Sequence, residues 1–543
     1  MISLLHEFST ALLSRFTIAG QLFSHVLKST PWPTGVALGA LCAIASAAAY
    51  LRQQTLRRKG LPLPPGPKGL PVIGNLLQIP AEHPWLVYND WKKKHGDMIY
   101  LTALGKGILV LNSLELIEEL FVKRATNYSD RSWSPVGELV RTMWSFAIMN
   151  YGQEWRNRRR LFHQFFYRTE NHHPVIEEET LSFLRRLADN PKSFREEART
   201  CLGLIIMRLS YGEVDANYNK NLMQAGDAVS LGFLEYSSPG RLFVNTIPAL
   251  RYIPSWFPGA GWKAKLEELA MLNDMIHNKP FDDVKTRVRS GKLGEYTSLA
   301  IQAIQELPDE GDLDCAYRER VARDVSAQAY TAGADTTASS AFALALALAM
   351  HPEVQRKAQD EINVVVGSQR LPVFSDVKDL PYVQAIVKEV SRWHTSAPMS
   401  LPHLSTKDDV FNGYFIPAKT IVIPNTWAVL HDPDVFPDPF DFKPERFLKD
   451  GKINPAVPDP EIAAFGYGRR ICPGRHLSND TFTLLTARLL ACFNVDPSLD
   501  EAGNPKPLKY EVTSAFISNP LPFDCDIVPR SERHLDLLKS QGV

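Results

Sequence analysis

The residues around Cys472 carry the strongest chemical signal in the sequence. The segment from Phe465 to Gly474 reads FGYGRRICPG. A cysteine that ligates a metal must stay a thiolate, and backbone N–H groups, nearby positive charge and the N-terminus of a following helix all favour that form. Glycines at 468 and 474 would let the backbone approach a flat ligand closely, and Arg470 could pair with an acidic group on that ligand. The apolar side chain of Phe465 would keep water from the sulfur.

A free structural cysteine in a glycine turn is the ordinary alternative for a single cysteine. Here every position of the pattern F-x-x-G-x-R-x-C-x-G is occupied. The segment therefore resembles the cysteine-ligand signature of the cytochrome P-450 family. That resemblance implies heme b as the cofactor, with Cys472 as the axial ligand of the iron and with Phe465, Arg470 and Gly474 in contact with the heme.

A second motif, AGADTT at Ala332–Thr337, is expected inside a long helix from about Arg318 to Met350. A threonine within a helix can divert a backbone carbonyl and open a local bulge with room for a small ligand. Taken alone, the hexapeptide would be a helix-packing patch with a solvated aspartate. Beside the cysteine segment it resembles the oxygen-activation groove of the family. That resemblance implies that Thr336 donates a hydrogen bond to dioxygen and that Asp335 relays protons from solvent.

Glu389 and Arg392 are placed one helical turn apart, on one face of a predicted helix. Taken alone, such a pair is most often a solvated salt bridge. The family resemblance implies instead that both residues join Arg446 in a buried structural network beneath the heme.

Three further residues resemble family contacts with the heme propionates: Trp155, Arg159 and His403. A lone histidine is more often a loop residue whose hydrogen bonds are satisfied by the protein. The run Arg156–Arg160 is too basic for all its members to bind heme. We therefore expect most of them to be solvated, and some to form a docking face for an acidic redox partner.

The first 75 residues differ in composition from the rest of the chain. Residues 33–51 carry no charge, can just cross a bilayer and are followed at once by basic residues. We expect residues 1–32 to be a lumenal lead, 33–51 a transmembrane anchor, 52–75 a basic and proline-rich hinge, and 76–543 a cytoplasmic heme-thiolate domain. The expected location is the endoplasmic reticulum membrane, with a single pass. A cleaved signal peptide and a buried core helix are the alternatives for the apolar stretch.

The overall composition is that of a globular protein, with 45% hydrophobic and 22% charged residues. The 60 basic and 60 acidic residues cancel, which gives no reason to expect nucleic acid as a partner. The six cysteines are scattered, without the spacing of a disulfide scaffold or a zinc site.

Helical periodicity dominates from about residue 114 to residue 350. Short β-forming segments lie at 98–103 and 107–112, spaced as in a hairpin, then at 410–415 and 420–424, and again near the C-terminus. The expected fold is mainly α with a small β-rich part, the cytochrome P-450 fold preceded by a single N-terminal transmembrane helix. We expect the substrate pocket to be apolar and to be formed by four mostly uncharged segments: Val136–Phe146, Ala329–Gly333, Ser396–Leu401 and Ala515–Ile517.

The resemblance is strongest to fungal microsomal members of specialised metabolism, including enzymes of the O-methylsterigmatocystin oxidoreductase type. It implies an NADPH-dependent monooxygenase that receives electrons from a membrane-bound NADPH–cytochrome P-450 reductase. Such an enzyme uses dioxygen to hydroxylate a hydrophobic small molecule, here a terpenoid or another fungal secondary metabolite. The alternatives are a same-fold isomerase or dehydratase that uses no dioxygen, a non-catalytic heme-binding sensor, and a soluble peroxygenase. The acid–threonine pair disfavours the first and the last of these.

Overall fold

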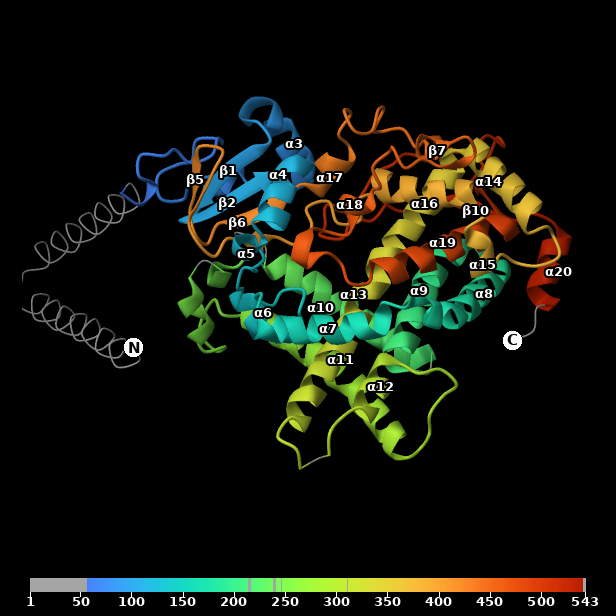
Figure 1. Ribbon diagram of the computed structural model, residues 1–543, viewed down its shortest axis with the longest axis horizontal. Coiled ribbons are helices and arrows are strands. Elements are labelled where there is room, and N and C mark those ends of the chain that lie inside the picture. The colour runs from blue at the N-terminus through green and yellow to red at the C-terminus, as the bar shows by residue number, and fades with distance from the viewer. Residues whose placement is uncertain (1–55, 213–215, 238–240, 246, 310, 541–543) are drawn as a thin grey trace, which may run out of the picture. The chain divides into compact units, whose positions relative to one another are not determined.

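The computed structural model of the protein describes residues 56–212, 216–237, 241–245, 247–309 and 311–540 (Figure 1). The predicted lead and the predicted anchor, residues 1–32 and 33–51, lie outside the described residues.

The chain divides into two compact units. The smaller comprises residues 1–63 and Asp409–Ile416, and the larger comprises Pro64–Asp408 and Pro417–Val543. In the described part of the smaller unit, β4 (Asp409–Phe411) pairs antiparallel with β5 (Tyr414–Ile416), and the Phe415 N–H donates to the Pro62 carbonyl at 2.8 Å. All the candidate site residues belong to the larger unit.

The larger unit is mainly helical, as the sequence predicts. Its described helices are α3 (Pro84–His95), α4 (Leu114–Glu118), α5 (Ala125–Tyr128), α6 (Pro135–Leu139), α7 (Gln153–Phe166), α8 (His173–Asp189), α9 (Phe194–Tyr211), α10 (Ala216–Ser237), α11 (Trp262–Arg289), α12 (Leu299–Gln305), α13 (Cys315–Met350), α14 (Pro352–Val365), α15 (Phe374–Val377), α16 (Pro381–Trp393), α17 (Thr426–Leu430), α18 (Glu461–Ala464), α19 (Arg475–Cys492) and α20 (Glu532–Ser540). Its described strands are β1 (Met98–Ala103), β2 (Lys106–Leu111), β3 (His403–Leu404), β6 (Ile421–Pro424), β7 (Leu448–Lys449), β8 (Lys452–Ile453), β9 (Phe493–Pro497) and β10 (Cys525–Pro529).

The largest sheet has the strand order β1-β2-β6-β3. The predicted hairpin is confirmed, since β1 and β2 pair antiparallel with Met98 opposite Leu111. Leu104 and Gly105 both have positive φ, which is the geometry of a two-residue hairpin turn, so the turn is one residue shorter than the sequence suggested. β6 pairs parallel with β2, and this joins the N-terminal hairpin to a strand more than 300 residues further along the chain.

α13 is the central helix of the larger unit (Figure 1). It packs against α7, α9, α11, α12, α16 and α19. From Ala341 to Ala349 its side chains are buried on all sides, which is possible only for a helix surrounded by other elements. The helix ends at Met350 as predicted, because Pro352 starts α14, and it begins at Cys315, three residues earlier than expected. Among the described helices, α13 alone has the length and apolar composition to cross a bilayer, and 72% of its most apolar stretch is buried within the fold.

Residues 64–75, the second half of the predicted hinge, lie against β1. The Tyr100 N–H donates to the Pro65 carbonyl at 2.7 Å. A Cβ atom at Gly66 would lie 2.0 Å from the Tyr100 carbonyl oxygen, so only glycine fits there. The prolines keep this stretch free of helix, as the sequence predicts, and its contacts make it part of the larger unit.

Candidate active site

A cavity of about 500 Å³ lies between α13 and the segment that carries Cys472. The predicted cofactor-binding and catalytic residues line it together: Trp155, Arg159, Asp335, Thr336, His403, Phe465, Arg470, Cys472 and Gly474. Each of the four predicted pocket segments also contributes to its wall, through Trp144 and Phe146, Ala329 and Gly333, Ser396 and Leu401, and Phe516 and Ile517. These residues come from six separate stretches of the chain, which therefore meet at one place.

The Cys472 segment forms a loop between α18 and α19. The Cys472 N–H donates to the Phe465 carbonyl at 2.7 Å and closes the loop. α19 begins at Arg475, directly after the glycine of the motif, so the positive end of its dipole lies close to the sulfur.

The electrostatic setting of the Cys472 sulfur combines opposing effects. Burial raises the pKa of the thiol, while the Gly474 N–H and then the charges of Arg159 and Arg475 act to lower it. The N–H donor and the positive charge that the sequence analysis expected beside the sulfur are therefore present. Burial outweighs them in the protein alone, whereas a metal cation bound to the sulfur would stabilise the thiolate directly.

The two glycines of this loop differ in their structural role. Gly468 has φ +54°, and a Cβ atom there would lie 2.2 Å from the Phe121 carbonyl oxygen of η2 (Glu119–Lys123). It is therefore required for contact with the protein backbone, and the expectation that it approaches a flat ligand is wrong. At Gly474 a Cβ atom would meet nothing closer than Phe162, at 3.8 Å. No described protein atom demands glycine at 474, so its missing side chain leaves space inside the cavity.

Three guanidinium groups, those of Arg131, Arg159 and Arg470, line the cavity, and none forms an ion pair with a described carboxylate. They donate instead to backbone carbonyls, namely those of Ala147, Leu401 and Pro402 for Arg131, of Ile471 for Arg159, and of Ser129, Phe146 and Met149 for Arg470. Burial lowers the pKa of Arg131 well below its usual range and that of Arg470 to about 10. Buried positive charge without an ion-paired carboxylate fits a ligand that carries carboxylates, as the two propionates of heme would.

Trp155 and His403 lie beside these cations. The Arg470 guanidinium lies 4.7 Å from the centre of the Trp155 ring. The His403 ring stacks on Phe121 with centroids 3.8 Å apart, and its Nδ1 donates to the Tyr128 carbonyl at 2.6 Å. Burial lowers the pKa of His403 well below its usual value. A neutral ring with its hydrogen on Nδ1 can only accept at Nε2, so donation to a propionate requires His403 to gain a proton when that group binds.

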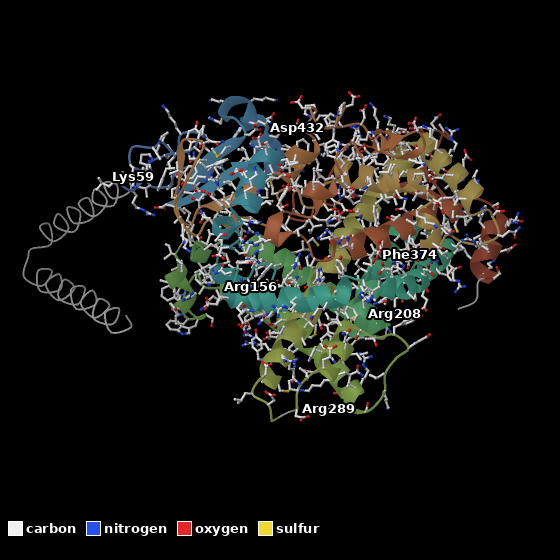
Figure 2. All side chains as sticks on the ribbon, in the orientation of Figure 1. Lys59, Arg156, Arg208, Arg289, Phe374 and Asp432 are labelled. Atoms are coloured by element: carbon white, nitrogen blue, oxygen red, sulfur yellow. The ribbon has the colours of Figure 1, made fainter. Side chains whose placement is uncertain are left out.

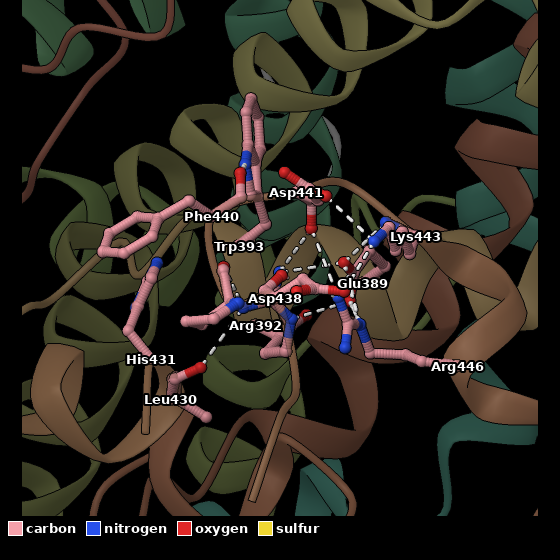
Figure 3. Close-up of polar contacts among 12 residues, drawn as sticks. Glu389, Arg392, Trp393, Leu430, His431, Asp438, Phe440, Asp441, Lys443 and Arg446 are labelled. Carbon is pink, nitrogen blue, oxygen red and sulfur yellow. Dashed lines mark hydrogen bonds and ion pairs between the residues drawn. The ribbon is translucent and has the colours of Figure 1, made fainter. Parts of the chain in front are cut away.

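Glu389, Arg392 and Arg446 form a buried network (Figure 3), which is the arrangement that the resemblance implied. Nε and Nη2 of Arg392 donate to the two carboxylate oxygens of Glu389, each at 2.8 Å, and Arg446 Nε lies 3.1 Å from the same carboxylate. Their remaining N–H groups reach backbone carbonyls of Leu430, Pro437, Asp438, Pro439 and Asp441. The network thus fixes the segment 430–446 to α16. Because α16 also packs against α18 and α19, it supports both ends of the Cys472 loop.

α13 remains α-helical through Ala332–Thr337, so the local bulge expected there is absent from this described stretch. Thr336 Oγ1 donates to the Ala332 carbonyl at 3.1 Å, which is the back-bonding anticipated for a threonine within a helix. A Cβ atom at Gly333 would lie 2.9 Å from Ile206 on α9. Close packing of α9 on α13 therefore explains this glycine, and Thr336 lies directly beside that contact on the cavity wall.

Asp335 is ion-paired. Nη2 of Arg199, on α9, lies 2.6 Å from its Oδ1, and Nε of the same arginine lies 3.1 Å from it. Arg199 Nη2 also contacts Oδ1 of Asp227, on α10. Asp335, which the sequence analysis predicts as a proton relay, therefore belongs to a three-residue charge cluster, and no motif in the sequence marks the other two members.

The basic run Arg156–Arg160 divides according to helical face. Arg156 and Arg160 are exposed, and Arg156 is labelled on α7 in Figure 2. Arg158 is buried and pairs with Asp324 of α13 at 2.6 Å, whereas Arg159 reaches the cavity. The expectation that most of this run is solvated is thus wrong for Arg158, because a residue two positions from Arg156 on a helix points to a different side.

Sequence reasoning missed part of the cavity wall. The additional residues include Arg131, which precedes α6, and several on the helices: Leu202, Ile205 and Ile206 on α9, Gly226, Val229 and Phe233 on α10, Ile276 on α11, and Gln328 on α13. The helical periodicity of α9 to α11 shows that each helix has an apolar face, but an apolar face that packs in a core and one that lines a cavity have the same pattern.

Comparison with known proteins identifies the family of this chain. The model of the cytochrome P450 family matches residues 64–525. Cytochrome P450 monooxygenase COX1 of Coprinopsis cinerea is 50% identical over 494 residues, which is 90% of this chain and 95% of that protein. Cytochrome P450 monooxygenase COX2 of the same fungus is 44% identical over 479 residues, covering 88% and 90%. Tryptamine 4-monooxygenase of Psilocybe cyanescens is 38% identical over 502 residues, covering 90% and 96%. The chain belongs to the cytochrome P450 family and is one of its monooxygenases.

Proposed function

We propose that this protein is an NADPH-dependent monooxygenase that hydroxylates an uncharged, hydrophobic small molecule, a terpenoid or another fungal secondary metabolite. The observation that carries the proposal is the single cavity in which the Cys472 loop, the unpaired cations and the Thr336 segment of α13 meet an apolar wall. Heme held by Cys472 would supply the activation of dioxygen, and the protein would supply binding, orientation and protons.

The site residues take distinct roles in this proposal. Cys472 would ligate the iron, and Phe465 and Gly474 would line the space that heme occupies beside it. Arg470, Arg159, Trp155 and His403 hold the propionates, and Arg131 joins them as a further cation. The network of Glu389, Arg392 and Arg446 has a structural role alone.

On the opposite side of the cavity, Thr336 and Asp335 would deliver protons. The Thr336 hydroxyl donates to the Ala332 carbonyl, so it must rotate away from that carbonyl before it can donate into the cavity. Asp335 is the neighbouring residue and is about one-third exposed, so it can exchange protons with water.

The charge of the cavity wall favours an uncharged substrate. Among the described lining residues the one carboxylate is Asp335, and Arg199 already pairs with it. A substrate with an ammonium group, as the name tryptamine 4-monooxygenase indicates for that relative, would find no free counter-charge on this wall. Aromatic side chains such as Trp144, Phe233 and Phe516 suit a terpenoid better.

Attachment to the endoplasmic reticulum membrane and electron supply by NADPH–cytochrome P450 reductase complete the proposal. Between α10 and α11, Phe243, Tyr252 and Trp256 are 74 to 79% exposed, and exposed aromatic side chains of this kind favour a membrane interface. Exposed Arg156 and Arg160 on α7 would contribute to the docking face for the acidic reductase.

The test is reconstitution of the full chain with heme, reductase and NADPH under isotopically labelled dioxygen. A panel of neutral terpene hydrocarbons is compared with tryptamine, and Cys472→Ser serves as the control. We expect products that carry one labelled oxygen from the neutral compounds alone, and a thiolate-type carbon monoxide spectrum that Cys472→Ser abolishes. Turnover confined to the amine would overturn the proposed substrate class. Products without labelled oxygen would overturn the monooxygenase reaction.

A further inference from the structure

We propose that Asp227 supplies protons to Asp335, and that Arg199, which contacts both carboxylates, holds the two residues together. Asp227 thus acts through Asp335 and is a positioning residue. The inference rests on the proposed role of Asp335 and goes beyond it. It adds a residue on a different helix, 108 positions earlier in the chain, for which the sequence carries no motif.

The geometry of the cluster brings two carboxylates to one cation. Nη2 of Arg199 contacts Oδ1 of Asp335 at 2.6 Å and also contacts Oδ1 of Asp227. The three residues come from α9, α10 and α13, so the cluster ties together three helices that all line the cavity. None of the three is fully enclosed, since Arg199 is 38%, Asp335 31% and Asp227 25% exposed.

The charge balance of the cluster favours one shared proton. Two carboxylates and one guanidinium leave a net negative charge, and like charges held this close are not both readily ionised. Burial, and then the neighbouring charge of Asp335, raise the pKa of Asp227 to about 7, while Arg199 acts to lower it. Tyr330 of α13 is the remaining titratable neighbour, and burial raises the pKa of its phenol, which therefore stays neutral. In the described parts of α6 and α11, which also pack on α10, no charged group acts on the Asp227 carboxyl.

The proton transfer that follows is balanced and needs no further reactant. The O–H bond of the Asp227 carboxyl breaks and a new O–H bond forms on an Asp335 oxygen. Arg199 stays in contact with both groups and offsets the charge that moves to Asp227. The proton then passes to the Thr336 side of α13, and water returns a proton to Asp227 at the surface. No group is oxidised or reduced.

The position of Asp227 links proton supply to the substrate. Gly226, Val229 and Phe233, on the same helix as Asp227, line the cavity. A substrate in the cavity therefore contacts α10, the helix that carries Asp227. A substrate that holds α10 against α9 and α13 would keep the proton donor in contact with Asp335. Without it, the contact would loosen.

The first measurement uses the resting heme protein without turnover. Infrared spectra are recorded across the neutral pH range for the natural protein, Asp227→Asn and the control Glu196→Gln. Glu196 pairs with Lys220 at 3.1 Å and also bridges α9 and α10, but this exposed pair lies outside the cluster. We expect a protonated-carboxyl band that titrates near pH 7, is lost in Asp227→Asn and is kept in Glu196→Gln. Persistence of that band in Asp227→Asn would overturn the inference. If the asparagine variant does not fold, Asp227→Glu replaces it and must shift the frequency of the band.

The second measurement is product formed per NADPH consumed, as a function of pH. We expect about a tenfold loss in Asp227→Asn, removal of the inflection near pH 7 and recovery in Asp227→Glu. Asp335→Asn separates this inference from the function on which it rests. If Asp335→Asn couples normally, the proposed role of Asp335 fails. If Asp335→Asn uncouples the reaction while Asp227→Asn behaves like Glu196→Gln, only the role of Asp227 fails.

Discussion

Replacing Glu389 by Gln tests how much the buried network stabilises the fold. Glu389 and Arg392 are both fully buried, and the single carboxylate accepts from Arg392, Arg446 and the Lys443 N–H. Glutamine keeps the shape but removes the negative charge, which leaves two guanidinium groups without a counter-charge. Breaking a buried ion pair on one side costs about 3–5 kcal/mol. That corresponds to roughly two to four orders of magnitude in the unfolding equilibrium.

The assay is equilibrium unfolding in urea, followed in parallel by far-ultraviolet circular dichroism and by heme absorbance. We expect both transitions to move together to lower urea, because the same network supports α16 and, through α18 and α19, the Cys472 loop. The matched control is Asp314→Asn, which breaks an exposed pair with Arg318 that should contribute less than about 1 kcal/mol. A loss in Glu389→Gln no larger than in this control would refute the reasoning that the network is stabilised by paired charge.

Three further outcomes are expected from single substitutions. Gly468→Ala should prevent folding or lower the free energy of unfolding in urea by about 3 kcal/mol or more. The added Cβ atom would lie 2.2 Å from the Phe121 carbonyl oxygen, and the residue has positive φ. Gly474→Ala should leave the unfolding of heme-free protein unchanged, because the added methyl group would meet no protein atom closer than 3.8 Å. It should lower the heme content measured per protein, because the methyl group would occupy space in the cavity; equal heme content would contradict this. Asp227→Asn should become more stable relative to the natural protein as pH rises from about 5 to about 8, in thermal unfolding. The sign follows from the raised pKa of Asp227, since the folded protein then binds more protons than the unfolded chain across that range and loses stability as pH increases; a pH-independent difference would argue against it.

The local parts of the site could be predicted from the sequence. The Cys472 loop spans ten consecutive residues, and its shape depends on glycine torsions and on the start of the following helix, all of which are encoded within the segment. The bounds of α13 were predictable to within three residues because periodicity and Pro352 both mark them. The hairpin of β1 and β2 is predictable because two short β-forming segments lie close together in the sequence, although its two-residue turn is not.

Prediction failed where a residue's role depends on a distant partner. The sequence predicts that Gly468 approaches a ligand, but in the structure this glycine faces Phe121, which is 347 positions away. The basic run on α7 contains one buried, one cavity-lining and two exposed arginines, and composition alone cannot separate them. Arg131 carries no motif of its own, and its place in the cavity follows from contacts with residues 401 and 402.

The chemical groups of the site are therefore predictable from the amino-acid sequence alone. The thiolate-ligand motif, the acid–threonine pair and the Glu389–Arg392 pair each lie within a few consecutive residues, and the family resemblance adds Arg446 to that pair. The pairing of these groups is visible only in the fold, which shows which cations have no ion-pair partner, which helices line the cavity, and that Asp335 shares Arg199 with Asp227. The physical reason is that ion pairs and cavity walls form between helix faces that meet in space, and periodicity along one helix does not identify the helix that will cover it.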